Sequence, residues 1–231
     1  MTAIDTFIPR MDILPPAQRR LWPELRPVTA LGFVLYGGTA VALRLGHRSS
    51  VDFDFFSEQA FDLDRLQEAI PFVATSTVLQ NRPNTSTVHV PIESTDGGVV
   101  KISFFGNIDF GRVGNPKFTE DGMLQVASLE DLMATKLKVI QQRAEAKDYR
   151  DIAAMLFAGI DLSLGLASAR IMYGMAFQPS ESLRALSYFK DGDLEMLKEE
   201  ERRVILEAVS KVRNLPVVKV LDRRLGVRVE V

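Results

Sequence analysis

Two aspartates separated by a single residue, Asp52 and Asp54, are the side chains in this sequence best placed to do chemistry together. They fall in the run from Val51 to Phe56, which predicts a strand. Side chains alternate between the two faces of a strand, so both carboxylates point the same way, about 6.6 to 6.8 Å apart. Negative charges at that distance repel each other unless a cation lies between them. The spacing therefore predicts a site for a hard divalent cation, Mg²⁺ or Mn²⁺.

A pair of glycines precedes the aspartates and predicts a phosphate-binding turn. The run from Phe33 to Tyr36 is typical of a short buried strand, and it stops at Gly37 and Gly38, where the backbone can approach a ligand closely. A helix follows from Thr39 and ends at Gly46. The N–H groups at the start of a helix bind phosphates. A phosphate cradle and a metal-binding pair on neighbouring elements are the layout of a nucleotidyl-transfer site.

Each motif has a simpler interpretation when it stands alone. A Gly-Gly turn after a strand is usually only a turn, and an Asp-x-Asp pair is most often part of a solvated strand face. Here the aspartates sit in a strongly apolar strand with aromatic residues at Phe53, Phe55 and Phe56, where unpaired charges are costly. The combination favours the functional interpretation.

The ordered motifs resemble a known family. From Gly37 to Phe56 the sequence reads GGTAVALRLGHRSSVDFDFF, and further on come Lys136, Arg143 and the run KDYRD at 147–151. This series resembles the nucleotidyltransferases of the AbiEii/AbiGii toxin type, a branch of the DNA polymerase β-like nucleotidyltransferase superfamily. The resemblance covers about residues 17–157.

The resemblance implies a reaction, a set of site residues and a biological role. The reaction would be nucleotidyl transfer from a nucleoside triphosphate to a hydroxyl group of an RNA, such as transfer RNA, or of a protein. The role would be that of a toxin in a bacterial toxin–antitoxin or phage-defence system, with a cognate antitoxin as partner. The implied catalytic residues are Asp52, Asp54, Lys136 and Asp148, of which Asp52 and Asp54 bind Mg²⁺ or Mn²⁺; the implied nucleotide-binding residues are Gly37, Gly38, Thr39, Arg48, Ser50 and Arg143.

One position departs from the family pattern. A third acid is expected on a later strand, in a pattern like Lys-Ile-Asp, but this chain has Lys101-Ile102-Ser103. A serine hydroxyl is not a useful base at neutral pH without an activating neighbour. Asp148 or an acid of the predicted 93–98 hairpin could take its place. The alternative is a catalytically silent nucleotide-binding module of the same fold.

Lys136 and Asp148 have structural interpretations as well. Lys136 lies at the margin of the apolar stripe of a helix that begins after Ser128, where a lysine can simply extend from the edge of a core to solvent. Asp148 is near the start of the next helix, where it suits the helix dipole, and it could pair with Lys136 or Arg143. The family resemblance favours Lys136 as a residue directed at the phosphates.

Composition agrees with a globular α/β protein. The chain has 231 residues, 46% of them hydrophobic, a net charge of −2 and no cysteine, which excludes disulfides and thiolate metal sites. No apolar run is long enough to span a membrane, so we expect a cytoplasmic protein without membrane contact. We expect a small mixed β-sheet nucleotidyltransferase core with a helical lead-in over 1–127, and an α-helical C-terminal region over 128–231 that completes the active site.

Periodicity and turn residues predict the remaining elements. Expected strands cover 72–80, 85–92, 99–105 and 123–127, with a hairpin turn at 93–98; expected helices cover 18–25, 62–70, 128–140, 146–157, 162–173, 180–189 and 193–212. The stretch 211–228 is rich in basic residues and is either solvated surface or a contact for RNA phosphates or an acidic partner.

Overall fold

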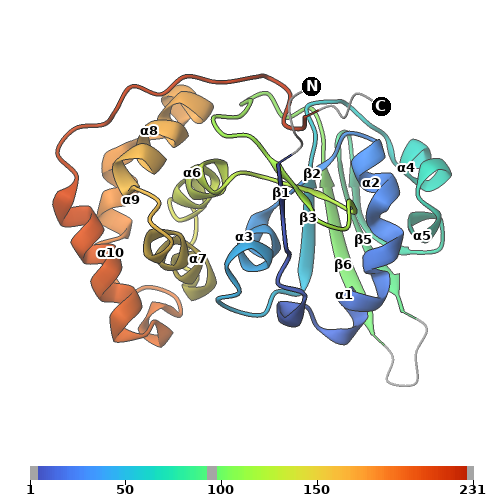
Figure 1. Cartoon of the computed structure of the whole chain (residues 1–231), viewed down its shortest axis with the longest axis horizontal. Helices are drawn as coiled ribbons and strands as arrows, with labels where there is room; N and C mark the ends of the chain where they lie inside the picture. The colour runs from blue at the N-terminus through green and yellow to red at the C-terminus, as the bar shows by residue number, and fades with distance from the viewer. Residues whose placement is uncertain (1–4, 93–97, 228–231) are drawn as a thin grey trace. The chain divides into compact units, whose positions relative to one another are not determined.

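The computed structural model describes residues 5–92 and 98–227, which form two compact units (Figure 1). Among the described residues, the first unit contains 5–92, 98–111, 115–127 and 223–227, and the second contains 112–114 and 128–222. The chain therefore passes between the units more than once. Residues 223–227 belong with the first unit although they follow the helices of the second.

The first unit is built on one mixed sheet, in the order β1-β7-β8-β2-β3-β6-β5-β4. β3 lies at its centre, antiparallel to β2 and parallel to β6, and β6 pairs antiparallel with β5. The described strands are β1 (Thr6–Phe7), β2 (Val34–Tyr36), β3 (Asp52–Phe56), β4 (Thr77–Arg82), β5 (Thr85–Pro91), β6 (Val99–Phe105), β7 (Lys117–Thr119) and β8 (Gln125–Val126).

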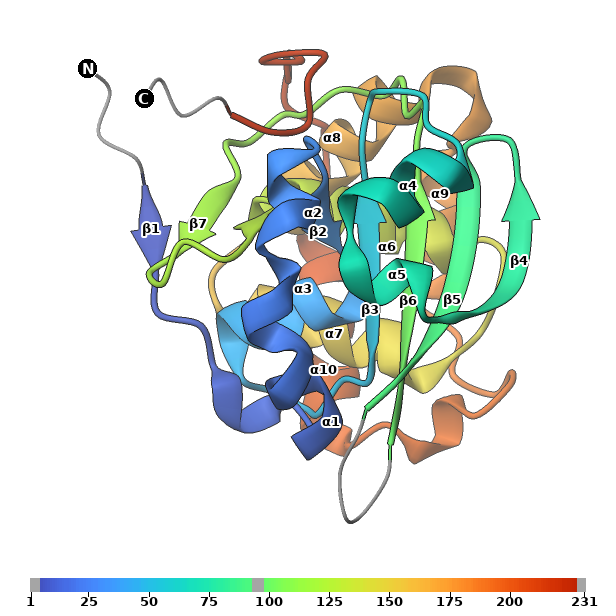
Figure 2. The same cartoon turned by 90° about the vertical axis from the view of Figure 1, so that its right-hand side faces the viewer.

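Helices cover this sheet unequally on its two faces. Figures 1 and 2 show α1, α2, α4 and α5 over one face and α3 on the other. Their bounds are α1 (Pro16–Leu21), α2 (Arg26–Ala30), α3 (Gly37–Leu45), α4 (Leu63–Ala69) and α5 (Pro71–Ala74). Asp62 caps α4 by accepting a hydrogen bond from the N–H of Arg65 at 2.8 Å, and Gly46 ends α3 in the left-handed conformation, both as predicted.

An aromatic cluster forms the core beneath the first group of helices. Phe55 stacks on Phe104 with ring centroids 5.7 Å apart, and Trp22 lies 6.5 Å from Phe53. Phe53, Phe55 and Phe104 are fully buried. Because side chains alternate along β3, burial of its phenylalanines on this face directs the intervening aspartates to the opposite face.

The second unit is helical, consisting of α6 (Leu129–Val139), α7 (Ala146–Phe157), α8 (Leu162–Tyr173), α9 (Pro179–Ala185) and α10 (Glu199–Lys211). Ser128 caps α6 by accepting a hydrogen bond from the N–H of Asp131 at 3.0 Å, as predicted. Close packing of α6 on α8 depends on Gly165, because a Cβ there would lie 2.4 Å from Cγ of Met133. The mixed sheet and the helices confirm the predicted α/β class.

Several predicted elements are wrong in part. The strand expected over 72–80 begins only at Thr77, because Pro71 opens the short helix α5. The N-terminal lead-in contains strand β1 as well as helices, and β7 lies between the expected strands 99–105 and 123–127, where no strand was predicted. The helix expected over 180–189 ends at Ala185, and the one expected from 193 begins as α10 at Glu199. The predicted hairpin turn falls on residues 93–97, which lie outside the described residues.

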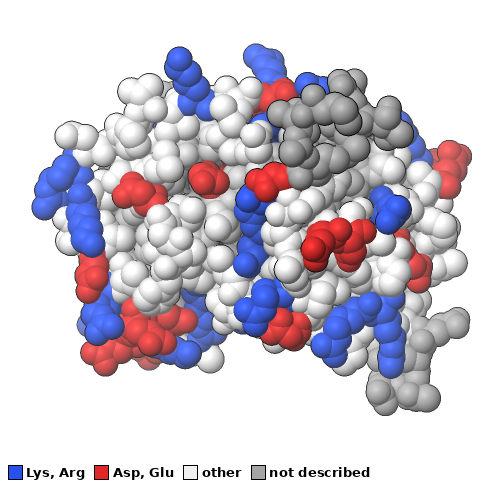
Figure 3. Space-filling view, viewed as in Figure 1, with Lys and Arg blue, Asp and Glu red and all other residues white. Residues whose placement is uncertain are grey.

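Within residues 5–92 and 98–227, no helix combines the length and the apolar character needed to cross a bilayer. Charged side chains of both signs are interspersed on the face seen in Figure 3. This distribution agrees with the net charge of −2.

Candidate functional site

The two aspartates of β3 lie on a half-buried face of the sheet. Asp52 and Asp54 are both partly exposed, whereas Phe53 and Phe55 between and after them are fully buried. The burial pattern confirms the alternation predicted from the sequence. Both carboxylates therefore lie on the face that also carries α3.

Gly37 brings the start of α3 against Asp54. Tyr36, the last residue of β2, pairs with Asp54 across the antiparallel ladder, and Gly37 follows with φ of 71°. A Cβ at Gly37 would lie 2.5 Å from Oδ2 of Asp54, closer than side-chain atoms pack. Both the backbone conformation and this close approach require glycine. The N-terminus of α3 and the carboxylate of Asp54 therefore lie next to each other.

The first turn of α3 suits an anion. Its N-cap residue, Tyr36, makes no side-chain capping hydrogen bond, so the first N–H groups of the helix, which include those of Gly38 and Thr39, have no cap from that side chain. These groups and the helix dipole favour negative charge. The site therefore combines a carboxylate that could hold a cation with backbone N–H groups that could hold an anion.

Thr39 and Ser50 fix the geometry of this turn through buried hydroxyl groups. The hydroxyl of Thr39 donates to the carbonyl of Asp52 and shares a 2.7 Å hydrogen bond with the hydroxyl of Ser50. These contacts join α3 to the start of β3. Arg48, in the connection between them, donates from Nη1 to the carbonyl of Ser49 at 3.0 Å.

β6 supplies the neighbours of the two carboxylates. Lys101 lies beside Asp52 in the parallel pair, with Nζ 3.7 Å from Oδ2, and Ser103 lies beside Asp54. Ser103 is the residue at which the family resemblance implies a third acid, an expectation that the strand register alone does not test. It is buried, and its hydroxyl accepts a 3.4 Å hydrogen bond from Thr87 of β5. No cluster of three or more acids, histidines or cysteines suited to a metal occurs among the described residues.

The second unit contains a buried ion-pair cluster. Nζ of Lys136 lies 2.7 Å from Oδ1 of Asp148 and 2.6 Å from Oδ2 of Asp151, and Nε of Arg143 lies 2.8 Å from Oδ2 of Asp148. Both aspartates are fully buried and Lys136 is 6% exposed. This arrangement confirms the predicted pairing of Asp148 with Lys136 and Arg143. The sequence analysis did not predict Asp151 as a partner of Lys136. Its position one helical turn after Asp148 places it on the same face of α7 and could have indicated this pairing.

Two opposing effects set the pKa of Asp148. Burial on its own would raise that pKa, but the positive charge of Lys136 and hydrogen bonds from Arg143 and Lys136 outweigh it. The pKa of Asp148 is therefore held below its ordinary value. The carboxylate stays ionised and is a weak proton acceptor.

Asp131 is a titratable residue that the sequence did not single out for chemistry. It lies in the first turn of α6 and accepts a 2.8 Å hydrogen bond from the N–H of Val113. Burial raises the pKa of Asp131 to about 6, even though hydrogen bonds from Val113, Ser128 and Gly114 oppose the shift. It is a structural acid that protonates just below neutral pH.

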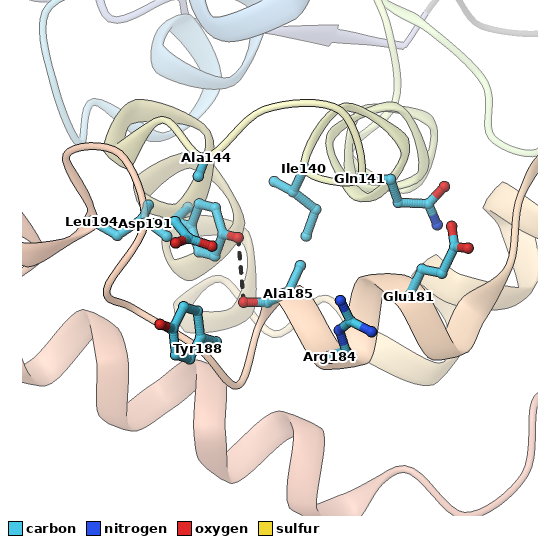
Figure 4. Close-up of a pocket in the computed structure, with 10 residues that line it drawn as sticks. Ile140, Gln141, Ala144, Glu181, Arg184, Ala185, Tyr188, Asp191 and Leu194 are labelled. Carbon is cyan, nitrogen blue, oxygen red and sulfur yellow. Dashed lines mark hydrogen bonds between the residues drawn. The ribbon is translucent and has the colours of Figure 1, made fainter.

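A cavity of about 720 Å³ opens in the second unit (Figure 4). Tyr149, whose hydroxyl donates to the carbonyl of Ala185, forms part of its lining, and Arg184 and Asp191 extend from other elements. None of the ten residues that line this cavity was predicted as a site residue.

Comparison with known proteins identifies similar sequences and folds. Residues 25–221 match the family described as nucleotidyl transferase AbiEii toxin of type IV toxin–antitoxin systems. An uncharacterised protein of Aquifex aeolicus (strain VF5) is 34% identical over 134 residues, which are 55% of this chain and 61% of that protein. The match thus spans less than two thirds of that relative's length.

Two solved structures of nucleotidyltransferases are similar to this chain to different degrees. A candidate nucleotidyltransferase from H. pylori has a TM-score of 0.52 at 20% identity, covering 84% of this chain and 90% of that one. MenT4, a nucleotidyltransferase toxin from Mycobacterium tuberculosis H37Rv, has a TM-score of 0.46 at 16% identity, covering 86% of this chain and 92% of that one. At these identities the H. pylori structure supports the fold alone.

Proposed function

Because the chain belongs to the AbiEii family of nucleotidyl transferase toxins, we propose that it transfers a nucleotidyl group from a nucleoside triphosphate to an acceptor hydroxyl, with release of pyrophosphate. The observation that supports this most is the contact of Gly37 with Asp54. Within the first unit, this contact puts helix N–H groups, which suit phosphates, next to a carboxylate, which suits a cation.

The donor set on β3 fits Mg²⁺ or Mn²⁺. Asp52 and Asp54 offer hard carboxylate oxygens on one partly exposed face. Magnesium commonly binds through one or two carboxylates, with substrate phosphates and water as its other ligands, so two acids are enough for such a site. When bound, the cation would neutralise charge on the phosphates as the bond to the leaving pyrophosphate breaks.

Other residues of the first unit would prepare the site for the triphosphate. The first turn of α3, from Gly37 to Thr39, would accept the phosphates on its N–H groups. The buried hydroxyls of Thr39 and Ser50 would act indirectly by holding that turn against β3. The guanidinium of Arg48 would add positive charge.

The roles of Lys136, Arg143 and Asp148 in nucleotide binding or catalysis stay predictions. Each of the three is part of the ion-pair cluster of the second unit. We propose that this cluster first of all joins α6 to α7. A direct role for Lys136 would require its ammonium group to exchange one of its two carboxylate partners for a phosphate.

The acceptor and the biological setting are proposed from the family. The acceptor would be a hydroxyl of an RNA, such as transfer RNA, or of a protein, and the cytoplasm would be the place of action. A cognate antitoxin would restrain the toxin. One observation favours a second candidate, a silent nucleotide-binding module: Ser103 lies beside Asp54 in place of a carboxylate.

A transfer assay tests the proposal. The purified protein is incubated with Mg²⁺, each α-labelled nucleoside triphosphate in turn, and either total RNA or cell lysate. We expect label on a macromolecule with the wild type and with Asp64→Asn, which changes an exposed acid of α4, but none with Asp54→Asn. Triphosphate binding without any transfer would establish the silent module instead.

A further inference from the structure

A row of polar side chains crosses the sheet from the carboxylates towards its edge. Asp52 of β3 pairs with Lys101 of β6, and Lys101 pairs with His89 of β5. Two contacts show that the strands present the same face here: Lys101 reaches Asp52 at 3.7 Å, and Thr87 donates to Ser103 at 3.4 Å. His89 is two residues after Thr87 on β5, so its imidazole lies on this face too.

His89 lies within reach of the position where the third acid is missing. The ladder between β5 and β6 is regular, so Ser103 is the diagonal neighbour of His89, next to the directly opposite Lys101. Diagonal neighbours in an antiparallel pair have Cα atoms ~7 to 8 Å apart, a gap that long and aromatic side chains span. His89 is partly exposed, and a ligand can therefore contact it.

Of the two described residues paired with His89 in the sheet, one is charged. From β6 it faces Lys101, with Asp52 of β3 one strand further on, and from β4 it faces the uncharged Thr77. α5, which contacts β5, covers the opposite face of the sheet and therefore does not face His89. The imidazole thus lies on the same face of the sheet as Asp52, two strands away, with Lys101 between them.

The proposed transfer needs a group that accepts the proton of the attacking hydroxyl. Ser103 is not a useful base, and Asp148 has both carboxylate oxygens in ion pairs and a lowered pKa. The acids of the predicted 93–98 hairpin lie outside the described residues. Among the described residues of β5 and β6, those that continue this face beside the aspartates are Thr87, Lys101 and Ser103, which are two hydroxyl residues and a lysine. A neutral imidazole is the group best suited to accept a proton near pH 7.

From this geometry we infer that His89 is the general base of the transfer, an assignment that rests on the proposed function. The imidazole takes the proton from the acceptor hydroxyl as its oxygen forms a bond to the α-phosphorus. The bond from that phosphorus to the bridging oxygen breaks, and pyrophosphate leaves with the electron pair. The imidazolium then returns the proton to water.

The test uses the fact that the chain has only two histidines, His47 and His89. Transfer rates are measured from pH 5 to 8 for the wild type, His89→Gln and His47→Gln. Imidazoles titrate in this range, so the wild type should show a rate that rises with pH and then levels off. His47→Gln should keep that rise. His89→Gln should lose it and react about 10²- to 10³-fold more slowly.

Further measurements separate a base from a structural or binding role. His89→Gln should keep the wild-type melting temperature and triphosphate affinity, and added imidazole should restore transfer to His89→Ala. A His89→Gln variant that keeps the pH-dependent rise and only raises the acceptor KM would overturn the assignment. A wild type that binds triphosphate but transfers nothing would overturn the proposed function, and with it this inference.

Discussion

At the scale of single residues, Gly37 determines how closely the start of α3 approaches Asp54. Its φ of 71° is unfavourable for other residues, and Asp54 leaves no room for a Cβ. A Gly37→Ala substitution therefore combines two costs, backbone strain and collision with the carboxylate. The collision would displace the carboxylate of Asp54, which we propose binds the cation.

We predict that Gly37→Ala lowers both the free energy of unfolding and the affinity for Mg²⁺–triphosphate. Strain at a positive φ costs about 1 to 2 kcal/mol, and displacement of Asp54 adds to it. Thermal unfolding and calorimetry with a non-hydrolysable triphosphate measure the two effects.

Gly122→Ala is the matched control for that substitution. Gly122 also has a positive φ, 68°, but a Cβ there would meet nothing within 4 Å. The control should show the strain cost with unchanged triphosphate affinity. Equal behaviour of the two variants in both measurements would contradict the proposed contact between α3 and the cation site.

Lys136 is the residue whose surroundings differ most from the sequence-based expectation. It was expected at the edge of an apolar stripe, yet it is buried between two carboxylates. Both partners come from the following helix: the pairing with Asp148 was expected, whereas the second partner, Asp151, and the burial of the lysine were not. Removing one member of a buried ion pair leaves an uncompensated charge, which is strongly destabilising.

We predict that Lys136→Met lowers the free energy of unfolding by roughly 3 to 5 kcal/mol. Lys147→Met is the control, because Lys147 forms an ion pair with Glu145 at the surface, where such pairs contribute about 0 to 1 kcal/mol. Urea denaturation of both variants measures the difference. A Lys136→Met variant as stable as the control, but with weakened triphosphate binding, would support the phosphate-binding role expected from the family.

At the scale of elements, the contribution of the start of α6 to the free energy of unfolding depends on pH through Asp131. Asp131 binds protons more tightly in the folded chain, with a pKa of about 6, than in the unfolded chain, where an aspartate has its ordinary value. Because the folded state holds the extra proton, Asp131 favours folding below the unfolded pKa. That contribution is lost as the pH rises from about 4 through 6.

We predict that the stability difference between the wild type and Asp131→Asn changes over this pH window by up to about 3 kcal/mol, with the wild type losing stability as pH rises. Urea denaturation at several pH values measures it. Glu181→Gln, at an exposed acid in the first turn of α9, is the control and should follow the wild type. A constant difference between wild type and Asp131→Asn would show that the pKa is not raised.

The elements predicted best are those whose signals are local. The helices α7 and α8 have the predicted bounds, because a regular apolar period runs the full length of each. The alternation along β3 was also visible, since its aspartates and phenylalanines differ so strongly in polarity. The stretch 72–80 was not predictable in this way, because its β-branched residues hid a helical turn that depends on Pro71.

At the scale of the whole molecule, the pairing of strands shows which residues share a face of the sheet with Asp54, which the sequence alone does not. Ser103 and His89 are far from Asp54 in the sequence, and only the order β3-β6-β5 brings them to one face. Net charge gives little guidance, because at −2 the chain has no strong overall attraction to nucleic acid. Recognition of the proposed acceptor would therefore depend on local groups.

The measurement that tests the central claim most directly is calorimetric binding of a non-hydrolysable nucleoside triphosphate with and without Mg²⁺. The account predicts binding by the wild type and by Asp64→Asn that depends on Mg²⁺. It predicts roughly hundredfold weaker binding, about 2.7 kcal/mol, by Asp54→Asn or after removal of the metal. Equal affinity in all of these conditions would contradict the assignment of Asp52 and Asp54 as the cation-binding pair.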